Sequence, residues 1–179
     1  TEKGSSYDKG YNSQFNFRVK NIYSPKLNFL KEALKKKFSV LEIGSGAGHF
    51  VNACEKSNIK VKGYEINRNL VQVAKKNGVK NIFHESPRKI NEIIKNNKSD
   101  VVCLISTLEH LEDPNSTLKL IKQSKTKYLY TCIPLFSLST FIENVFPNVY
   151  PRQLNASHTH LYTYKSIKYM IKKFKFKIL

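Results

Sequence analysis

The sequence lacks a long apolar run and any feature of a targeting segment. Its longest uninterrupted apolar run is Val101–Ile105, five residues in a chain of 179, whereas a membrane-spanning helix needs roughly 18. Residues 1–18 are polar and aromatic, which excludes the charged-then-apolar pattern of a secretory signal. With 40% hydrophobic residues, these absences predict one globular domain with one continuous core, which we expect in the cytoplasm.

Cysteine is also scarce. The three cysteines, Cys54, Cys103 and Cys132, show no close spacing, and the last two lie inside apolar, strand-like runs. This distribution predicts buried free thiols in a reducing compartment instead of disulfides or metal ligands. We therefore expect no bound metal.

Acidic residues and arginines are few. The chain has 31 basic against 13 acidic residues, a formal net charge of +18, but only four of the basic residues are arginines. Arginine is the residue favoured for base readout and bidentate phosphate contacts, so the charge favours solvated lysine faces. After Glu143 the sequence has seven basic residues and no acidic one. The C-terminal quarter is therefore a positive surface that suits an anionic acceptor or partner.

From about residue 25 the sequence alternates strand-like and helix-like segments. The expected strands are 38–43, 59–65, 81–84, 100–105 and 128–133, and the expected helices 27–34, 49–56, 68–77, 87–96, 113–124 and 164–173. This alternation predicts an α/β fold, a doubly wound, mostly parallel sheet with helices on both faces. Residues 25–179 form the expected domain, and residues 1–24 an aromatic segment that packs on it or forms a lid.

The alternation breaks at residues 134–160. This stretch holds three prolines and many aromatic residues without a clear period, which predicts a long functional loop on the substrate side of the sheet. Residues 174–179 alternate apolar and polar side chains like the start of a sixth strand. We therefore expect the sheet to be incomplete in this chain.

A glycine turn joins the first expected strand to the next helix. It reads Glu42-Ile-Gly44-Ser-Gly46-Ala-Gly48, and Glu65 follows 21 residues after Gly44, at the end of the second strand. Glycines let a ligand approach the main chain, the helix N-terminus offers free N–H groups, and Glu65 can accept hydrogen bonds from both hydroxyls of a ribose. The arrangement predicts a nucleoside site, but neither the G-x-G-x-x-G dinucleotide pattern nor a phosphate-loop Lys-Ser/Thr is present.

The turn resembles motif I of the class I S-adenosylmethionine-dependent methyltransferases. Gly63–Ile66 looks like the second motif of that family, and residues 106–114 resemble its segment after the fourth strand. The resemblance implies a Rossmann-like fold of seven strands, whose C-terminal hairpin is incomplete here, and S-adenosylmethionine as cofactor. It implies cofactor contacts from Glu42, Gly44, Ser45, Gly46, Gly48, Glu65, Ile66, Thr107 and Leu108. Glu85 or Ser86 would contact adenine, with capping of the following helix as the alternative.

Residues 151–163 look like methyltransferases that act on surface carbohydrates and on small-molecule oxygens. A hydroxyl acceptor benefits from a general base, and His110, His158 and His160 fall in loops beyond the expected strand ends. These three are the candidate catalytic residues, and Arg152 is the candidate contact to an anionic acceptor. In an extended segment His158 and His160 would face one side and could bind a metal, but no carboxylate or cysteine matches them.

The expected acceptor is a small molecule or carbohydrate. Nucleic acid is disfavoured because the N/D-P-P-Y pattern and a Pro-Cys nucleophile are both absent. Two alternatives stay open: a cofactor-binding module without turnover, and an RNA methyltransferase that uses the basic C-terminal surface.

Overall fold

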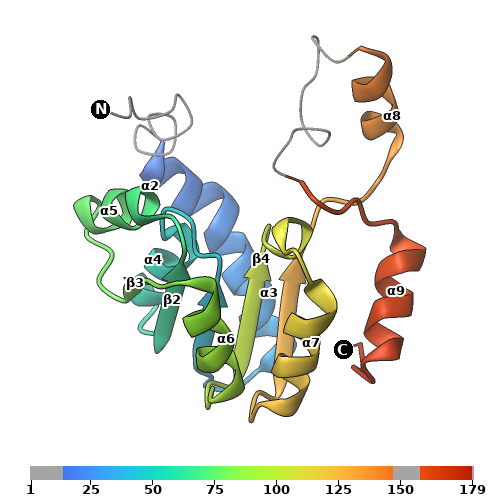
Figure 1. Cartoon of the computed structure of the whole chain (residues 1–179). Helices are drawn as coiled ribbons and strands as arrows, with labels where there is room; N and C mark the ends of the chain where they lie inside the picture. Colours follow the sequence, from blue (N-terminus) through green and yellow to red (C-terminus); the bar gives the residue numbers. More distant parts are fainter. Residues whose placement is uncertain (1–13, 147–157, 179) are drawn as a thin grey trace.

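The protein is built around a five-stranded sheet in the order β3-β2-β1-β4-β5. A computed structural model describes residues 14–146 and 158–178 of the chain (Figure 1). Every strand pairs in parallel with its neighbours. The strands are β1 Val40–Ile43, β2 Val61–Glu65, β3 Ile82–His84, β4 Val101–Ile105 and β5 Tyr128–Cys132. The α/β fold class expected from the sequence is confirmed.

Helices cover both faces of this sheet (Figure 1). They are α2 Phe15–Arg18, the π-helical turn η1 Val19–Tyr23, α3 Ser24–Leu34, α4 His49–Lys56, α5 Arg68–Lys76, α6 Pro87–Lys95, the 3₁₀ turn η2 Leu108–His110, α7 Pro114–Gln123, α8 Leu138–Val145 and α9 Tyr164–Lys173. None of these helices has the length and apolar content that crossing a membrane requires.

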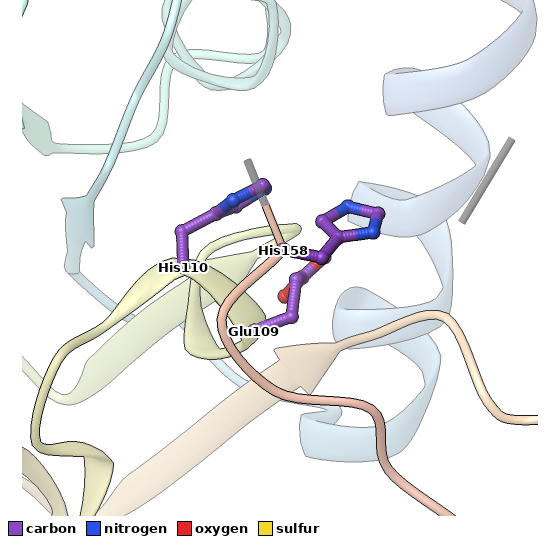
Figure 2. A group of neighbouring side chains, drawn as sticks. All are labelled: Glu109, His110 and His158. Atoms are coloured by element: carbon purple, nitrogen blue, oxygen red, sulfur yellow. The ribbon is translucent and has the colours of Figure 1, made fainter. Parts of the chain in front are cut away.

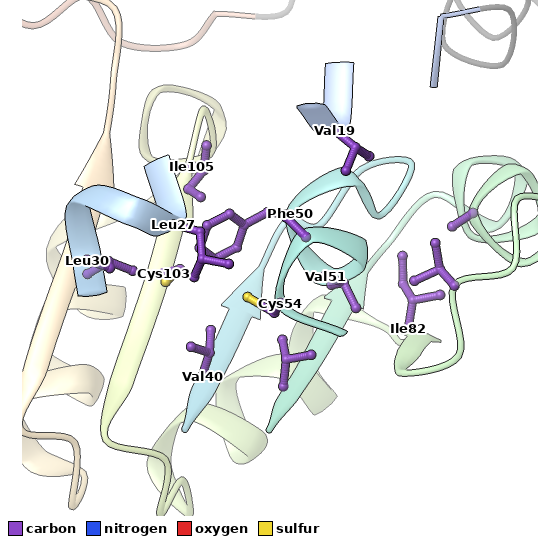
Figure 3. Packing of buried hydrophobic residues seen from close by; sticks show 14 of the residues in the cluster. Val19, Leu27, Leu30, Val40, Phe50, Val51, Cys54, Ile82, Cys103 and Ile105 are labelled. Carbon is purple, nitrogen blue, oxygen red and sulfur yellow. The ribbon is translucent and has the colours of Figure 1, made fainter. Parts of the chain in front are cut away.

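The central strands divide the core into two clusters, one on each face. Val40 and Cys103 belong to the cluster under α3 and α4 (Figure 3), whereas their neighbours Leu41 and Val102 belong to the cluster under α6 and α7. Successive side chains of a strand point to opposite faces, so a parallel strand covered on both sides is mostly apolar, as β4 is at every position. This requirement explains the unbroken apolar runs in the sequence.

The N-terminal helical segment begins earlier than the sequence pattern predicted. The expected helix spanned 27–34, but helical structure runs from Phe15 to Leu34. Phe15, Val19 and Leu27 are buried along one stripe, four residues apart or a multiple of four, as a helix face requires. The exposed Phe17 hides that stripe in the sequence. The aromatic residues Tyr7 and Tyr11 lie outside the described residues.

His49 lies buried between two aromatic rings at the start of α4. Its ring stacks on Phe15 at a centroid distance of 4.7 Å and on Tyr23 at 5.1 Å. Burial, aided by the nearby charge of Arg18, lowers the pKa of His49 to about 4. Phe15 and Tyr23 therefore pack on the domain through this histidine, whereas Phe17 is exposed.

The chain end at residues 174–178 is a helix-closing turn, and the predicted strand is wrong for these residues. Lys175 adopts φ +55°, its N–H donates to the Lys172 carbonyl at 2.9 Å, and the Phe176 N–H donates to the Ile171 carbonyl at 3.0 Å. This is a Schellman closure of α9. Phe174 and Phe176 both pack on the cluster under α6 and α7, which satisfies the alternating apolar pattern without a strand.

Helix α8 interrupts the segment that the sequence predicted as a loop. Ser137 and Thr140 form a reciprocal capping box at its start, and Figure 1 shows α8 standing away from the sheet. Its base is closed where the Phe136 N–H donates to the Tyr162 carbonyl at 2.7 Å. Phe136, Phe141 and Phe146 are half exposed or more.

The lysine-rich surface makes few ion pairs. Within the described residues there are two, Lys89–Glu92 at 3.3 Å and Lys127–Asp100 at 3.0 Å, and the lysines of both are exposed. Other lysines lie over aromatic rings, as Lys36 does, with its Nζ 4.8 Å from the Tyr128 centroid. The excess positive charge is thus largely left to solvent.

The buried histidine makes stability depend on pH. Because the folded state keeps His49 neutral down to about pH 4, the unfolded state, with an ordinary pKa near 6.5, takes up a proton first as the pH falls. We expect the free energy of unfolding to lose about 2–3 kcal/mol from this residue between pH 7.5 and 4.5. Urea denaturation of wild type and His49→Phe at both pH values measures it.

The matched control is His84→Asn, which removes an exposed histidine. That variant should keep the full pH difference of the wild type, whereas His49→Phe should show a smaller one. Carboxyl groups titrate alike in all three proteins and cancel in the comparison. An equal pH difference in wild type and His49→Phe would remove His49 as the source.

Candidate active site

The glycine turn after β1 is held by both neighbouring strands. Gly44, Gly46 and Gly48 all have positive φ, and the N–H groups of Gly44 and Ser45 donate to the Tyr64 carbonyl of β2 at 2.9 and 3.1 Å. A Cβ on Gly44 would fall 2.5 Å from Thr107 Oγ1, but one on Gly46 would meet nothing within 4 Å. The turn is therefore packed at Gly44 and open at Gly46, where a ligand can approach the main chain.

Glu65 closes the mouth of this turn from the end of β2. Its Oε2 accepts the Gly46 N–H at 2.7 Å and its Oε1 accepts the Asn67 N–H at 2.8 Å. The carboxylate is thus fixed between the ends of β1 and β2, beside the open part of the turn. The next residue, Ile66, is 57% exposed, so its apolar side chain is available to a flat ligand.

Glu42 is buried in β1 beneath the turn. It is 2% exposed, and its Oε2 has no hydrogen-bond partner within the part of the chain that the structure describes. Burial, with the charge of Glu65 adding to it and the Ser45 hydroxyl opposing it, raises its pKa well above the usual range. A buried acceptor without a donor, next to an open main-chain cradle, fits a ligand that carries hydrogen-bond donors, as S-adenosylmethionine does.

Thr107 fastens the end of β4 to the end of β1. Its hydroxyl lies 3.1 Å from both the Ile43 and the Ile105 carbonyl oxygens, and Thr107 and Leu108 are both buried. Their side chains point into the protein, so a cofactor contact from either residue would use its main chain.

The two residues after β3, Glu85 and Ser86, have different surroundings. Ser86 Oγ accepts the Lys89 N–H at 3.3 Å and so caps α6, which is the alternative that the sequence left open for it. The side chains of Glu85, His84 and Arg68 line a surface groove of about 430 Å³. Glu85 is therefore the freer candidate of the two for an adenine contact.

Two of the three candidate catalytic histidines lie together. His110 in η2 and His158 before α9 have ring centroids 4.7 Å apart, above the buried Glu109 (Figure 2). The main chain of Glu109 joins the two segments: its carbonyl accepts the N–H groups of Thr159 at 3.0 Å and His160 at 3.1 Å. Residues distant in the sequence thus meet beyond the carboxyl end of β4, where open α/β sheets bind ligands.

His160 has a different neighbourhood. Its ring stacks on Tyr162 at 5.9 Å, and its Nδ1 lies 2.9 Å from Thr159 Oγ1. The segment bends at Thr159, so the extended arrangement in which His158 and His160 share one side is not found. Arg152 lies outside the described residues.

The sequence analysis missed Glu109. This carboxyl group is 1% exposed, and its Oε2 has no hydrogen-bond partner within residues 14–146 and 158–178. Burial raises its pKa, against the opposing effects of its own backbone N–H, His110 and His158. The signal was an acid directly before a candidate base and four residues after the end of an apolar strand. The premise that no carboxylate accompanies the histidines is therefore wrong, although the expectation of no metal itself stays untested.

Comparison with known proteins places the chain in a family. The profile of the family described as "Methyltransferase domain" matches residues 15–179, and the chain belongs to that family. No significant match was found among curated proteins.

Several solved structures that share this fold are methyltransferases. An S-adenosylmethionine-dependent methyltransferase from Archaeoglobus fulgidus aligns with a TM-score of 0.69 and 20% identity, over 97% of this chain and 75% of that one. Magnesium protoporphyrin IX methyltransferase from Synechocystis, with bound S-adenosylhomocysteine, aligns with 0.65 and 13%, over 100% and 80%. A similar enzyme from Aquifex aeolicus aligns with 0.60 and 18%, over 91% and 87%.

The protein is therefore a methyltransferase, as the resemblance of its motifs to that family implied. The cofactor expected from the sequence, S-adenosylmethionine, is supported by the family and by these neighbours. The particular residues assigned to it stay predictions that the geometry of the turn allows.

Glu65 provides a direct test of the cofactor site. Glu65→Ala should weaken S-adenosylmethionine binding by about 1–3 kcal/mol, because hydrogen bonds to a charged group are lost. Isothermal titration calorimetry measures the change. Glu55→Ala is the matched control, since Glu55 also accepts main-chain N–H groups, those of Lys80 and Asn81, far from the turn. Equal affinities in the two variants would remove Glu65 from the site.

Gly46 tests whether the open side of the turn receives the ligand. Gly46→Ala and Gly78→Ala both place a Cβ at positive φ with no neighbour within 4 Å. Both should therefore lose stability by about 1–2 kcal/mol from backbone strain. Only Gly46→Ala should lower cofactor affinity, by tenfold or more in calorimetry. Loss of affinity in both variants would point to general loosening of the fold instead.

Proposed function

We propose that the protein transfers the methyl group of S-adenosylmethionine to an oxygen of a sugar or small metabolite in a reducing compartment such as the cytoplasm. The cofactor supplies a methyl group already activated on a sulfonium. The protein then has to hold the cofactor, orient the acceptor and manage one proton. The buried free thiols Cys54 and Cys103 support the reducing compartment.

The observation that carries the proposal is the histidine pair above Glu109. A hydroxyl acceptor must lose its proton as it attacks, and imidazole has a suitable basicity near neutral pH. His110 is exposed and His158 half-buried. The pair therefore has access to solvent, and the buried Glu109 lies directly beneath it. His110 lies three residues after Thr107, which packs on the glycine turn.

The acceptor side favours an anionic or polar small molecule. Helix α9, next to His158, presents Lys165, Lys168 and Lys172 to solvent, and Arg152 is the expected bidentate contact. The exposed Tyr164 and Tyr169 on the same helix keep RNA as the second candidate, because bases stack on aromatic rings beside positive charge. Lysines in place of arginines weigh against it.

One experiment separates the two acceptors. The chain is incubated with isotope-labelled methyl donor and either a metabolite extract or total RNA, and the products are analysed by mass spectrometry. Label in a hydroxylated small molecule supports the proposal, and label confined to RNA supports the second candidate. No labelled product with either, although calorimetry shows cofactor binding, would indicate a binding module without turnover.

The histidine pair predicts a split between turnover and binding. His158→Ala and His110→Ala should each lower the turnover number by roughly 10²–10⁴-fold, as loss of a general base does, with cofactor affinity unchanged. His160→Ala should have a smaller effect, because that ring stacks on Tyr162 away from the pair. If His160→Ala alone abolished turnover, the assignment of the pair would be wrong.

A further inference from the structure

We propose that Glu109, His110 and His158 bind one divalent transition-metal cation. The three side chains form the only such group of histidine, cysteine or acidic ligands found within residues 14–146 and 158–178, and their ligand atoms all lie within 4.8 Å of one another. Figure 2 shows the two imidazole rings side by side above the Glu109 carboxylate, with His110 carried by η2 and His158 by the segment before α9.

The ligand set specifies the kind of cation. Two imidazoles and one carboxylate suit zinc and related first-row metals, whereas magnesium and calcium prefer oxygen ligands alone. Ligands bind zinc at about 2.0–2.2 Å, which places them roughly 3.5 Å apart in a tetrahedron. The ligand atoms lie up to 4.8 Å apart, so small rotations of the side chains would bring them to that separation. The exposed side chain of His110 has room for such a rotation.

The Glu109 carboxylate indicates a bound cation independently of the proximity of the three side chains. Glu109 is 1% exposed, yet its Oε2 has no hydrogen-bond partner among the described residues. A buried carboxylate oxygen without a donor is costly, and a cation beside it would remove that cost. Salt bridges do not fill this role, since neither ion pair in the described part of the chain involves Glu109.

The main chain holds the ligands in place before any cation binds. The Glu109 carbonyl accepts hydrogen bonds from the Thr159 N–H at 3.0 Å and the Thr159 hydroxyl at 2.9 Å. The Thr159 hydroxyl also lies 3.2 Å from the Leu111 carbonyl. Thr159 therefore holds the main chain of His158 next to its two partners, so only side-chain rotations are left for the cation to order.

Three protein ligands leave a tetrahedral cation one open position. The role of this position rests on the proposed function: it would take the acceptor oxygen, and the cation would lower the pKa of the acceptor hydroxyl. The hydroxyl proton passes to solvent, the oxygen forms a bond to the methyl carbon, and the carbon–sulfur bond breaks with its electron pair left on sulfur. The two histidines then act as ligands, and the cation replaces them as the means of activation.

Binding of zinc itself is the test, and it needs no acceptor. Untagged protein, treated with chelator and dialysed, is titrated with zinc chloride by calorimetry, and with cobalt chloride while the visible absorption of tetrahedral cobalt is followed. We expect one zinc ion per chain with micromolar affinity or tighter. His110→Ala, His158→Ala and Glu109→Gln should each weaken binding at least tenfold and abolish the cobalt absorption.

His160→Ala is the matched control, a histidine two residues from His158 that lies outside the cluster. It should bind zinc like the wild type. Circular dichroism checks folding, and the exposed His110 gives a variant in which folding is not at risk. The proposal is overturned if the wild type binds no zinc, or if His160→Ala loses binding while His110→Ala keeps it.

The outcome is separable from that of the proposed function. Zinc binding without any methylated product would support the metal site and refute the proposed function. Methyl transfer that is unaffected by chelator, in a protein that binds no zinc, would support the proposed function and refute the metal site. A histidine would then act as the general base.

Discussion

The position of β1 at the centre of the sheet is the constraint on which the site depends. β1 pairs in parallel with β2 on one side and β4 on the other, and strand order reverses there, which opens a crevice at the carboxyl ends of the strands. The glycine turn is bonded to Tyr64 of β2, and Thr107 joins β4 to Ile43. Both connections exist only because the three strands end side by side.

Two buried carboxyl groups flank that crevice. Glu42 lies beneath the turn and Glu109 beneath the histidines, and each has an oxygen without a hydrogen-bond partner in the described residues. Such groups lower the stability of a fold unless a ligand satisfies them. A ligand donor at Glu42 and a cation at Glu109, as proposed above, would each remove that cost.

The sequence predicted the sheet well because its signals are local. A strand buried on both faces is mostly apolar, and closely spaced glycines after such a strand mark a tight turn, so β1, β4 and the turn at Gly44 could be found without the structure. The partnership of Glu109 with His158 could not, since it depends on a bend at Thr159 and on hydrogen bonds between distant segments. The alternation of Phe174 and Phe176 led to a wrong prediction of a strand, because a helix-closing turn can place two aromatic rings on the same core as a strand does.

The scarcity of ion pairs has a consequence for the surroundings of the protein. With a net charge of +18 and two ion pairs in the described chain, both with an exposed lysine, the lysines mainly repel one another. Contacts such as that of Lys36 over the Tyr128 ring do not neutralise charge. Repulsion between exposed charges falls once the Debye length shortens to about 10 Å or less, so dissolved salt should make the folded chain more stable.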